Sequence, residues 1–180
     1  MFRTFAAVDV VEFYDLFKRN GIVIWVDGGW GVDALVGEQT RPHADLDIAI
    51  QTKDLQRFDE LLTERGFVLQ DRDDTTPWNY VLGDERGRDI DVHAIALDAA
   101  GNGIYGPPER GIMYPAGSLT GTGVIAGRTV RCIEASHLLA FHSGYELDDN
   151  DIHDVLVLCK HFAFEVPAEV LSRLEQQGDD

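Results

Sequence analysis

The sequence predicts an α/β (α+β) fold, in which a mixed sheet with flanking helices is followed by a small C-terminal helical domain. Within residues 1–133, short apolar runs rich in β-branched residues alternate with amphipathic segments of helical period. From residue 134 the character changes to helix. The length of 180 residues suits one compact domain with a small appendage. We therefore expect an α/β core over 1–133 and a C-terminal helical domain over 134–180.

The first half of the core alternates helix and strand. Apolar residues recur at helical spacing over 8–17, and the continuous apolar run 22–26 is typical of a buried strand. A glycine pair opens the next segment, and Gly66 is a C-terminal stop signal. The predicted order is helix 8–17, strand 22–26, a helix from the glycines to Leu35, strand 45–50 and helix 55–65.

The second half predicts a hairpin and then helices. Strands over 78–82 and 90–95 flank a turn-rich link, and a short strand follows at 129–133. Residues 98–123 are rich in Gly and Pro and are expected to be the least regular part. Asn150 and Asp151 open an apolar stripe that predicts a helix, and Pro167 suits the first residue of a final helix.

Asp45 and Asp47 are the most informative residues. In an extended chain, residues i and i+2 point to the same face, so both carboxylates aim at one spot while Leu46 and Ile48 aim into a core. Two close anions repel, so folding opposes this arrangement unless something compensates. A hard divalent cation such as Mg²⁺, which takes oxygen ligands and bridges to substrate phosphates, is the usual compensation. The pattern predicts a nucleotidyltransferase active site.

Two further features suggest phosphate binding. Gly28 and Gly29 follow a strand and precede a helix, where a backbone without Cβ and helix N-terminal amides favour a phosphate. A tight turn is the alternative. Arg41 lies four residues before Asp45, and its guanidinium is well shaped to grip phosphate oxygens, although a surface arginine would read the same. His43 is interpreted as solvated or as supporting the site from behind.

A third carboxylate is expected on a neighbouring strand. Asp89, Asp91 and His93 share one face there, while Ile90 and Val92 point the other way. Asp91 is interpreted as a metal ligand or as the general base that takes a proton from an acceptor hydroxyl. Asp89, nearer the turn, is expected to be exposed and is a candidate substrate contact. His93 could orient a carboxylate, touch substrate or make a structural hydrogen bond.

Three aromatic residues could line an organic acceptor, although aromatics at such spacing more often pack in a core: Trp78, Tyr80 and Tyr145. The net charge of −17 repels nucleic acid and anionic lipid and favours cationic small molecules. No apolar run approaches the roughly 20 residues that span a bilayer. We therefore expect a cytoplasmic protein whose partner is a small molecule, with no nucleic acid or membrane partner.

At this point the residues indicate a family. Gly28-Gly29 followed by Asp45-Leu46-Asp47 looks like the signature of the polymerase-beta-like nucleotidyltransferases. More narrowly, the chain resembles the lincosamide nucleotidyltransferases and is also similar to the aminoglycoside 2''-nucleotidyltransferases. The segments that carry this resemblance are 27–35, 40–47, 90–93, 123–132, 142–146 and 151–155.

The resemblance implies Mg²⁺-dependent transfer of a nucleoside monophosphate from an NTP, with ATP expected, to a hydroxyl of an antibiotic, and hence resistance. It implies that Asp45 and Asp47 hold the metals, that Asp91 completes the carboxylate set and serves as base, and that Gly28, Gly29 and Arg41 hold the triphosphate. A lincosamide acceptor is favoured over an aminoglycoside. The alternatives are nucleotidylation of another metabolite or a protein, or a non-catalytic nucleotide-binding module. Relatives of this kind can dimerise, so a homodimer is a further expectation.

Overall fold

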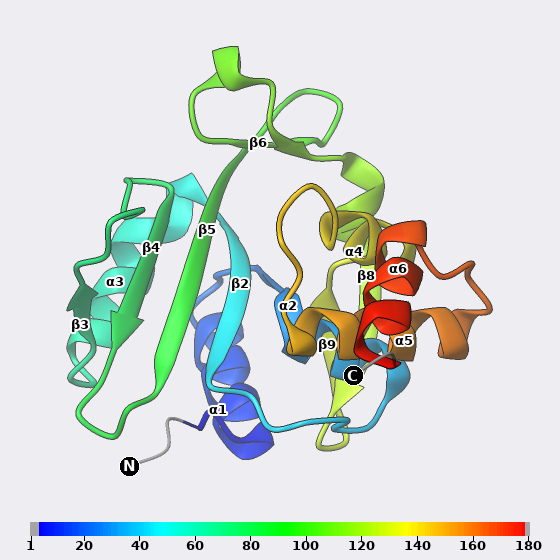
Figure 1. Cartoon of the computed structure of the whole chain (residues 1–180). Coiled ribbons are helices and arrows are strands. Elements are labelled where there is room, and N and C mark those ends of the chain that lie inside the picture. Colours follow the sequence, from blue (N-terminus) through cyan, green and yellow to red (C-terminus); the bar gives the residue numbers. More distant parts are fainter. Residues whose placement is uncertain (1–3, 179–180) are drawn as a thin grey trace.

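The computed structural model describes residues 4–178 and arranges them as one mixed sheet with helices on both faces (Figure 1). The main path of the sheet runs in the order β3-β4-β5-β2-β1-β9-β8. Two of these pairs are parallel, β2 with β5 and β1 with β9, and the others are antiparallel. The strands of this path are β1 (Ile24–Val26), β2 (Asp45–Gln51), β3 (Val68–Gln70), β4 (Asn79–Gly83), β5 (Asp89–Leu97), β8 (Gly121–Ile125) and β9 (Arg128–Cys132). The predicted mixed sheet with flanking helices is therefore confirmed.

The long strand β5 extends beyond this sheet and carries a small projection. Its last residues pair with β6 (Gly103–Tyr105), which in turn pairs with β7 (Met113–Tyr114). Figure 1 shows this projection above the rest of the sheet. The stretch 98–123, expected to be the least regular part, does contain the short strands β6 and β7, because backbone pairing to β5 organises residues whose Gly and Pro content hides these strands.

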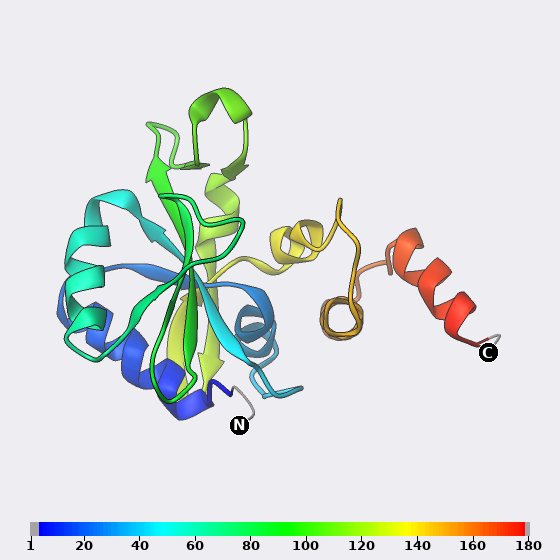
Figure 2. The same cartoon turned by 60° about the vertical axis from the view of Figure 1, so that its left-hand side comes forward.

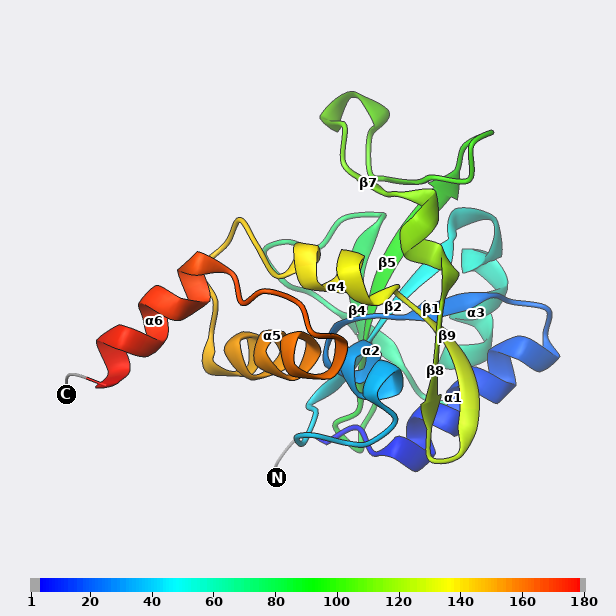
Figure 3. The same cartoon turned by 90° about the vertical axis from the view of Figure 1, so that its right-hand side faces the viewer.

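The helices divide between the two faces of the sheet. Figures 2 and 3 show α1 (Ala7–Arg19) and α3 (Leu55–Thr63) on one face. On the other side lie α2 (Gly28–Val36), α4 (Ala135–Phe141), α5 (Asp149–Phe162) and α6 (Ala168–Gly178). The apolar face of the sheet packs on α1 and α3, where Phe13, Phe17 and Phe58 are fully or almost fully buried. The opposite face carries a smaller apolar cluster that includes Trp25, Ala49 and Ile95, with room beside it for polar side chains.

Most predicted elements are present with shifts of a few residues at their ends. The helix that opens at the glycines is confirmed, and Asp27 caps it by accepting the N–H of Gly28. The hairpin of β4 and β5 is also confirmed. The helix expected from Asn150 begins at Asp149 instead, because Asp148 is the N-cap and forms a capping box with Asp151. The edge strand β3 has no counterpart among the predicted elements.

The division at residue 133 stays a prediction. Leu147, Ile152, Val155 and Val170 form an apolar cluster within the C-terminal helices. A second cluster is continuous across the proposed boundary, because it joins Val32 and Ala49 of the core to Leu138 and Leu158. No helix among the described residues is both long and apolar enough to cross a membrane.

Candidate active site

The parallel pairing of β2 with β5 brings the predicted carboxylates together. In this register Asp45 lies opposite Asp89, and Asp47 lies opposite Asp91. Because side chains alternate along a strand, all four project from the face that α2 covers, while Leu46 and Ile48 are fully buried on the opposite face. The sequence argument for a shared face is therefore confirmed for both strands.

Burial and mutual repulsion raise the pKa of three of these carboxyls. For Asp47, desolvation is the largest cause and the charges of Asp45 and Asp91 add to it, so its pKa lies well above the usual range. Desolvation followed by the charge of Asp89 raises the pKa of Asp45. Burial likewise raises the pKa of Asp91. A site that disfavours its own ionised carboxylates is one in which a cation is strongly favoured.

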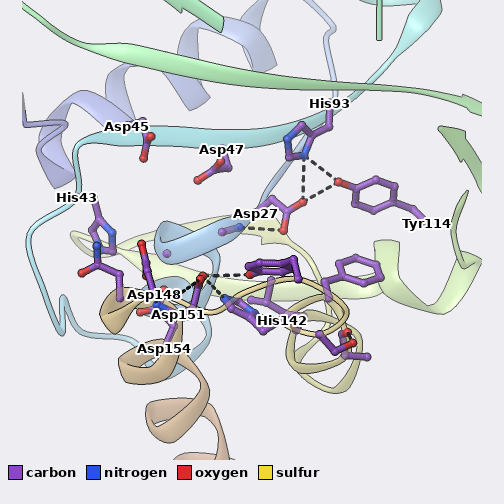
Figure 4. Close-up of a pocket in the computed structure, with 18 of the residues that line it drawn as sticks. Asp27, His43, Asp45, Asp47, His93, Tyr114, His142, Asp148, Asp151 and Asp154 are labelled. Carbon is purple, nitrogen blue, oxygen red and sulfur yellow. Dashed lines mark hydrogen bonds and ion pairs between the residues drawn. The ribbon is translucent and has the colours of Figure 1, made fainter. Parts of the chain in front are cut away.

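A buried hydrogen-bonded chain lies beside this cluster (Figure 4). The Tyr114 hydroxyl donates to Asp27 over 2.9 Å, so its oxygen accepts from Nδ1 of His93, also over 2.9 Å. Although burial alone would lower it, the hydrogen bond and charge of Asp27, with the charges of Asp91 and Asp47, raise the pKa of His93 to about 9. The imidazolium therefore stands between Asp27 and the cluster at neutral pH.

The donor set fits a divalent metal. One ligand atom from each of Asp47, Asp91 and His93 lies within 4.8 Å of the others, and with His93 protonated the two carboxylates are the groups that can ligate a metal. Oδ1 of Asp91 is buried and has no hydrogen-bond partner, and Nε2 of His93 lies 3.5 Å from it. A buried carboxylate oxygen without a partner is costly unless a ligand binds it. Carboxylate oxygens are the donors that Mg²⁺ prefers.

The glycine pair gives the cluster room. Gly28 has φ of +53°, and a Cβ there would overlap the carboxylate of Asp47. A Cβ on Gly29 would overlap the guanidinium of Arg41 and lie 2.6 Å from Nδ1 of His43. Glycine is therefore required at both positions by close approach of other side chains, and not only by a tight turn.

Arg41 and His43 are both held more firmly than the sequence indicated. Nε and Nη2 of Arg41 lie 2.8 and 2.6 Å from the two carboxylate oxygens of Asp154. His43 is 3% exposed, and its Nε2 lies 2.5 Å from Oδ2 of Asp33. The interpretation of His43 as solvated is wrong, because it packs on Trp30 and is buried behind the glycines.

A cavity of about 830 Å³ joins these groups, within the roughly 300–1,000 Å³ of small-molecule sites. Asp45, Asp47 and His93 lie on one wall, and Asp148 and Asp151 lie on the wall that the C-terminal helices supply (Figure 4). A third, largely apolar part of the lining consists of Tyr105, Ile112, Met113, Tyr114, Leu138 and Phe141. Asp91 is not among the lining residues, but it pairs in register with Asp47, which is, and its side chain is 24% exposed.

Three residues predicted near the acceptor lie elsewhere. Tyr80 pairs in register with Val92, so it faces the apolar core and its hydroxyl donates to Asp59 of α3 over 2.9 Å. Trp78 is half-buried beside Gly106 and is not among the residues that line the cavity. Asp89 is 5% exposed and paired with Arg72 at 3.3 Å, so the expectation that it is exposed is wrong.

Tyr145 does line the cavity, and its hydroxyl donates to Oδ1 of Asp151 over 3.0 Å. The residues missed in the sequence are Asp27, Asp33 and Tyr114. Only Asp27 carried a signal, since Asp before a helix is a preferred N-cap. Tyr114 comes from the stretch that was expected to be the least regular.

Comparisons with known proteins identify the family of the chain. The family model of aminoglycoside-2''-adenylyltransferase matches residues 9–158. The chain belongs to this family. A lincosamide resistance protein of Staphylococcus haemolyticus is 32% identical over 141 residues, which cover 78% of this chain and 86% of that protein. A 2''-aminoglycoside nucleotidyltransferase of Escherichia coli is 30% identical over 64% of this chain, and the match spans 59% of that protein.

The fold agrees as well. The crystal structure of the lincosamide antibiotic adenylyltransferase LnuA with lincomycin bound matches with a TM-score of 0.75 and 30% identity, over 86% of this chain and 97% of LnuA. The matched segment 9–158 contains every site residue described above, from Asp27 to Asp154. The chain is thus a nucleotidyltransferase of the aminoglycoside-2''-adenylyltransferase family, and its carboxylate cluster lies where β2 and β5 of that fold run side by side.

Replacing Asp47 by Asn is expected to stabilise the metal-free enzyme. Because the pKa of Asp47 is raised in the folded state, ionisation of this carboxyl opposes folding. The free energy of unfolding is therefore highest at low pH, where Asp47 is protonated, and it falls as the pH rises through the folded-state pKa. Asn cannot ionise and removes this loss, so the midpoint of thermal unfolding in EDTA at pH 8 should rise by a few degrees. Each kcal/mol of added stability raises the midpoint by about 2–4 °C in a chain of this size. The exposed Asp73→Asn is the matched control. A lower midpoint for Asp47→Asn would contradict the repulsion argument.

Proposed function

We propose that this enzyme transfers a nucleoside monophosphate, from ATP in the first instance, to a hydroxyl of a lincosamide, and that Mg²⁺ is its metal. The reaction class follows from the family, whereas this donor, metal and acceptor are inferences. The lining of the cavity supports a lincosamide as the acceptor. Candidate metal-binding carboxylates stand on one wall, and a broad apolar part of the lining adjoins them through Tyr105 and Tyr114, which suits an amphipathic acceptor better than a polycation.

The residues divide into three roles. Asp45 and Asp47 would hold Mg²⁺, which supplies charge neutralisation on the phosphates when bound. Gly28, Gly29 and Arg41 would receive the triphosphate at the N-terminus of α2. The amides and glycines there allow close approach of the phosphates, and the guanidinium adds a donor of fixed direction.

Asp91 would complete the carboxylate set and act as the general base. The acceptor hydroxyl oxygen bonds to the α-phosphorus of the nucleotide, the bond from that phosphorus to the bridging oxygen breaks, and pyrophosphate leaves. The hydroxyl proton passes to Asp91, whose raised pKa makes it a better base than an ordinary carboxylate. His93 would orient Asp91, because its Nε2 lies 3.5 Å from Oδ1 of that carboxylate.

An aminoglycoside is the second candidate acceptor. The acidic wall favours it, because Asp148 and Asp151 line the cavity and would attract protonated amines. Both carboxylates are partly engaged in the capping box of α5, and Asp151 also accepts from Tyr145. The relatives named above include both kinds of enzyme.

A mass-spectrometric end-point assay tests the proposal. The protein is incubated with MgCl₂, each NTP in turn, and a panel of lincomycin, clindamycin and several aminoglycosides. We expect lincomycin and clindamycin to gain the mass of one AMP, with no gain when EDTA replaces MgCl₂. A gain only on aminoglycosides would transfer the assignment to the second candidate. No gain on any compound would overturn the antibiotic acceptor.

Asp91→Asn should separate chemistry from donor binding. Loss of a general base lowers turnover by about 10²–10⁴-fold, whereas the affinity for the Mg²⁺ complex of the nucleotide should change far less. Single-turnover kinetics and calorimetric titration of the nucleotide measure the two quantities. The control is Asp74→Asn, which makes the same carboxylate-to-amide change near β4 at a residue that does not line the cavity. Normal turnover for Asp91→Asn would show that another residue accepts the proton.

A further inference from the structure

Asp154 of α5 reaches across to the core from the C-terminal helices. Its side chain is 2% exposed, and it belongs to an otherwise apolar stretch in which Val155 and Leu158 are fully buried. A carboxylate buried to this degree needs a partner. The partner is Arg41, which is 113 residues away in the chain and comes from the 37–44 loop between α2 and β2.

The contact fixes the direction of the Arg41 guanidinium. Asp154 accepts from Nε and Nη2 in a side-on, two-point pair of 2.8 and 2.6 Å, and the carbonyl of Pro42 accepts from Nη1 over 3.2 Å. Arginine carries five N–H donors in a rigid plane, so this pairing uses three of them. One N–H group remains on each of Nη1 and Nη2. Arg41 lines the cavity, and its Nη2 lies beside Gly29, which lines it as well.

The rest of the 37–44 loop is held against the same helices. Thr40 donates its backbone N–H and its hydroxyl to Oδ1 of Asp33, over 3.0 and 2.7 Å, so its oxygen accepts from Nε2 of His153 over 3.1 Å. His153 precedes Asp154 on α5. Two neighbouring residues of α5, His153 and Asp154, therefore bind two neighbouring residues of the loop, Thr40 and Arg41. Of these, Arg41 lies beside Gly29.

We propose that Asp154 is a positioning residue for the nucleotide donor: it holds the Arg41 guanidinium beside Gly29 so that its free end meets the triphosphate. This inference rests on the proposed function, because it takes an NTP as the donor. It also assigns Asp154 to the donor side of the cavity and removes it from the acidic groups that could attract an acceptor amine.

The guanidinium of Arg41 keeps its positive charge in this environment. Burial alone would lower the pKa of Arg41, but the hydrogen bonds and charge of Asp154, with the charges of Asp33 and Asp45, raise it. A free arginine side chain would lose rotamer entropy on binding phosphate, whereas Arg41 has already been ordered. Pre-orientation of this kind increases donor affinity without any direct contact of Asp154 with the nucleotide.

The experiment measures donor binding without turnover. The full-length enzyme is titrated calorimetrically with α,β-methylene-ATP in MgCl₂. We expect Asp154→Asn and Arg41→Gln each to weaken binding by about tenfold, in line with a charge-assisted hydrogen bond. The double variant should bind within about twofold of Arg41→Gln alone, because Asp154 acts through Arg41. Glu169→Gln, an equal charge change on an exposed residue of α6, should bind like the wild type.

Arg41→Lys is the second variant, since it keeps the charge and loses the planar two-point pair. It should also weaken binding of α,β-methylene-ATP, and it keeps the inference testable if Asp154→Asn fails to fold. Wild-type affinity in Asp154→Asn or in Arg41→Lys would overturn the positioning role, as would additive losses in the double variant. Failure of the wild-type enzyme to bind the nucleotide would instead overturn the proposed function, and this inference with it.

Discussion

The parallel pairing of β2 with β5 is the constraint on which the rest of the site depends. It sets Asp47 beside Asp91 and Asp45 beside Asp89, on a sheet face whose other side is packed with apolar residues. A shift of one residue in this register would turn the carboxylates into the core. The sheet therefore buries these carboxylates and enforces a repulsion that the side chains alone would avoid. The raised pKa values of Asp45, Asp47 and Asp91 follow from burial first and from the neighbouring carboxylates second.

Two features of the surroundings make this cluster of carboxylates possible. On one side, His93 places an imidazolium against Asp91 and is itself held by Tyr114 and Asp27. On the other side, the glycines at the start of α2 let side chains approach more closely than a Cβ would permit. The two devices share Asp27, which both caps α2 and accepts from Tyr114. The start of α2 and the His93–Tyr114 pair are thus connected by one buried carboxylate.

Local signals in the sequence were sufficient for the carboxylates and the glycines. Asp45 and Asp47 share a face because of strand geometry, and the same rule places Asp89, Asp91 and His93 together. Contacts between distant segments were not accessible in this way. The partner of Arg41 is 113 residues away, and Tyr114 donates to a residue 87 positions before it. The sequence alone did not place Tyr80, because the face of β4 on which its side chain lies depends on the register of β4 with β5.

The account is tested most directly by locating the metal. Crystals grown with MnCl₂ and α,β-methylene-ATP would be measured at a wavelength where Mn²⁺ scatters anomalously, since carboxylate sites for Mg²⁺ also accept Mn²⁺. We predict anomalous density within coordination distance of Asp45 and Asp47, with the triphosphate extending to Gly28, Gly29 and Arg41. Nucleotide bound in the cavity with manganese density absent from these carboxylates, or centred elsewhere, would contradict the account.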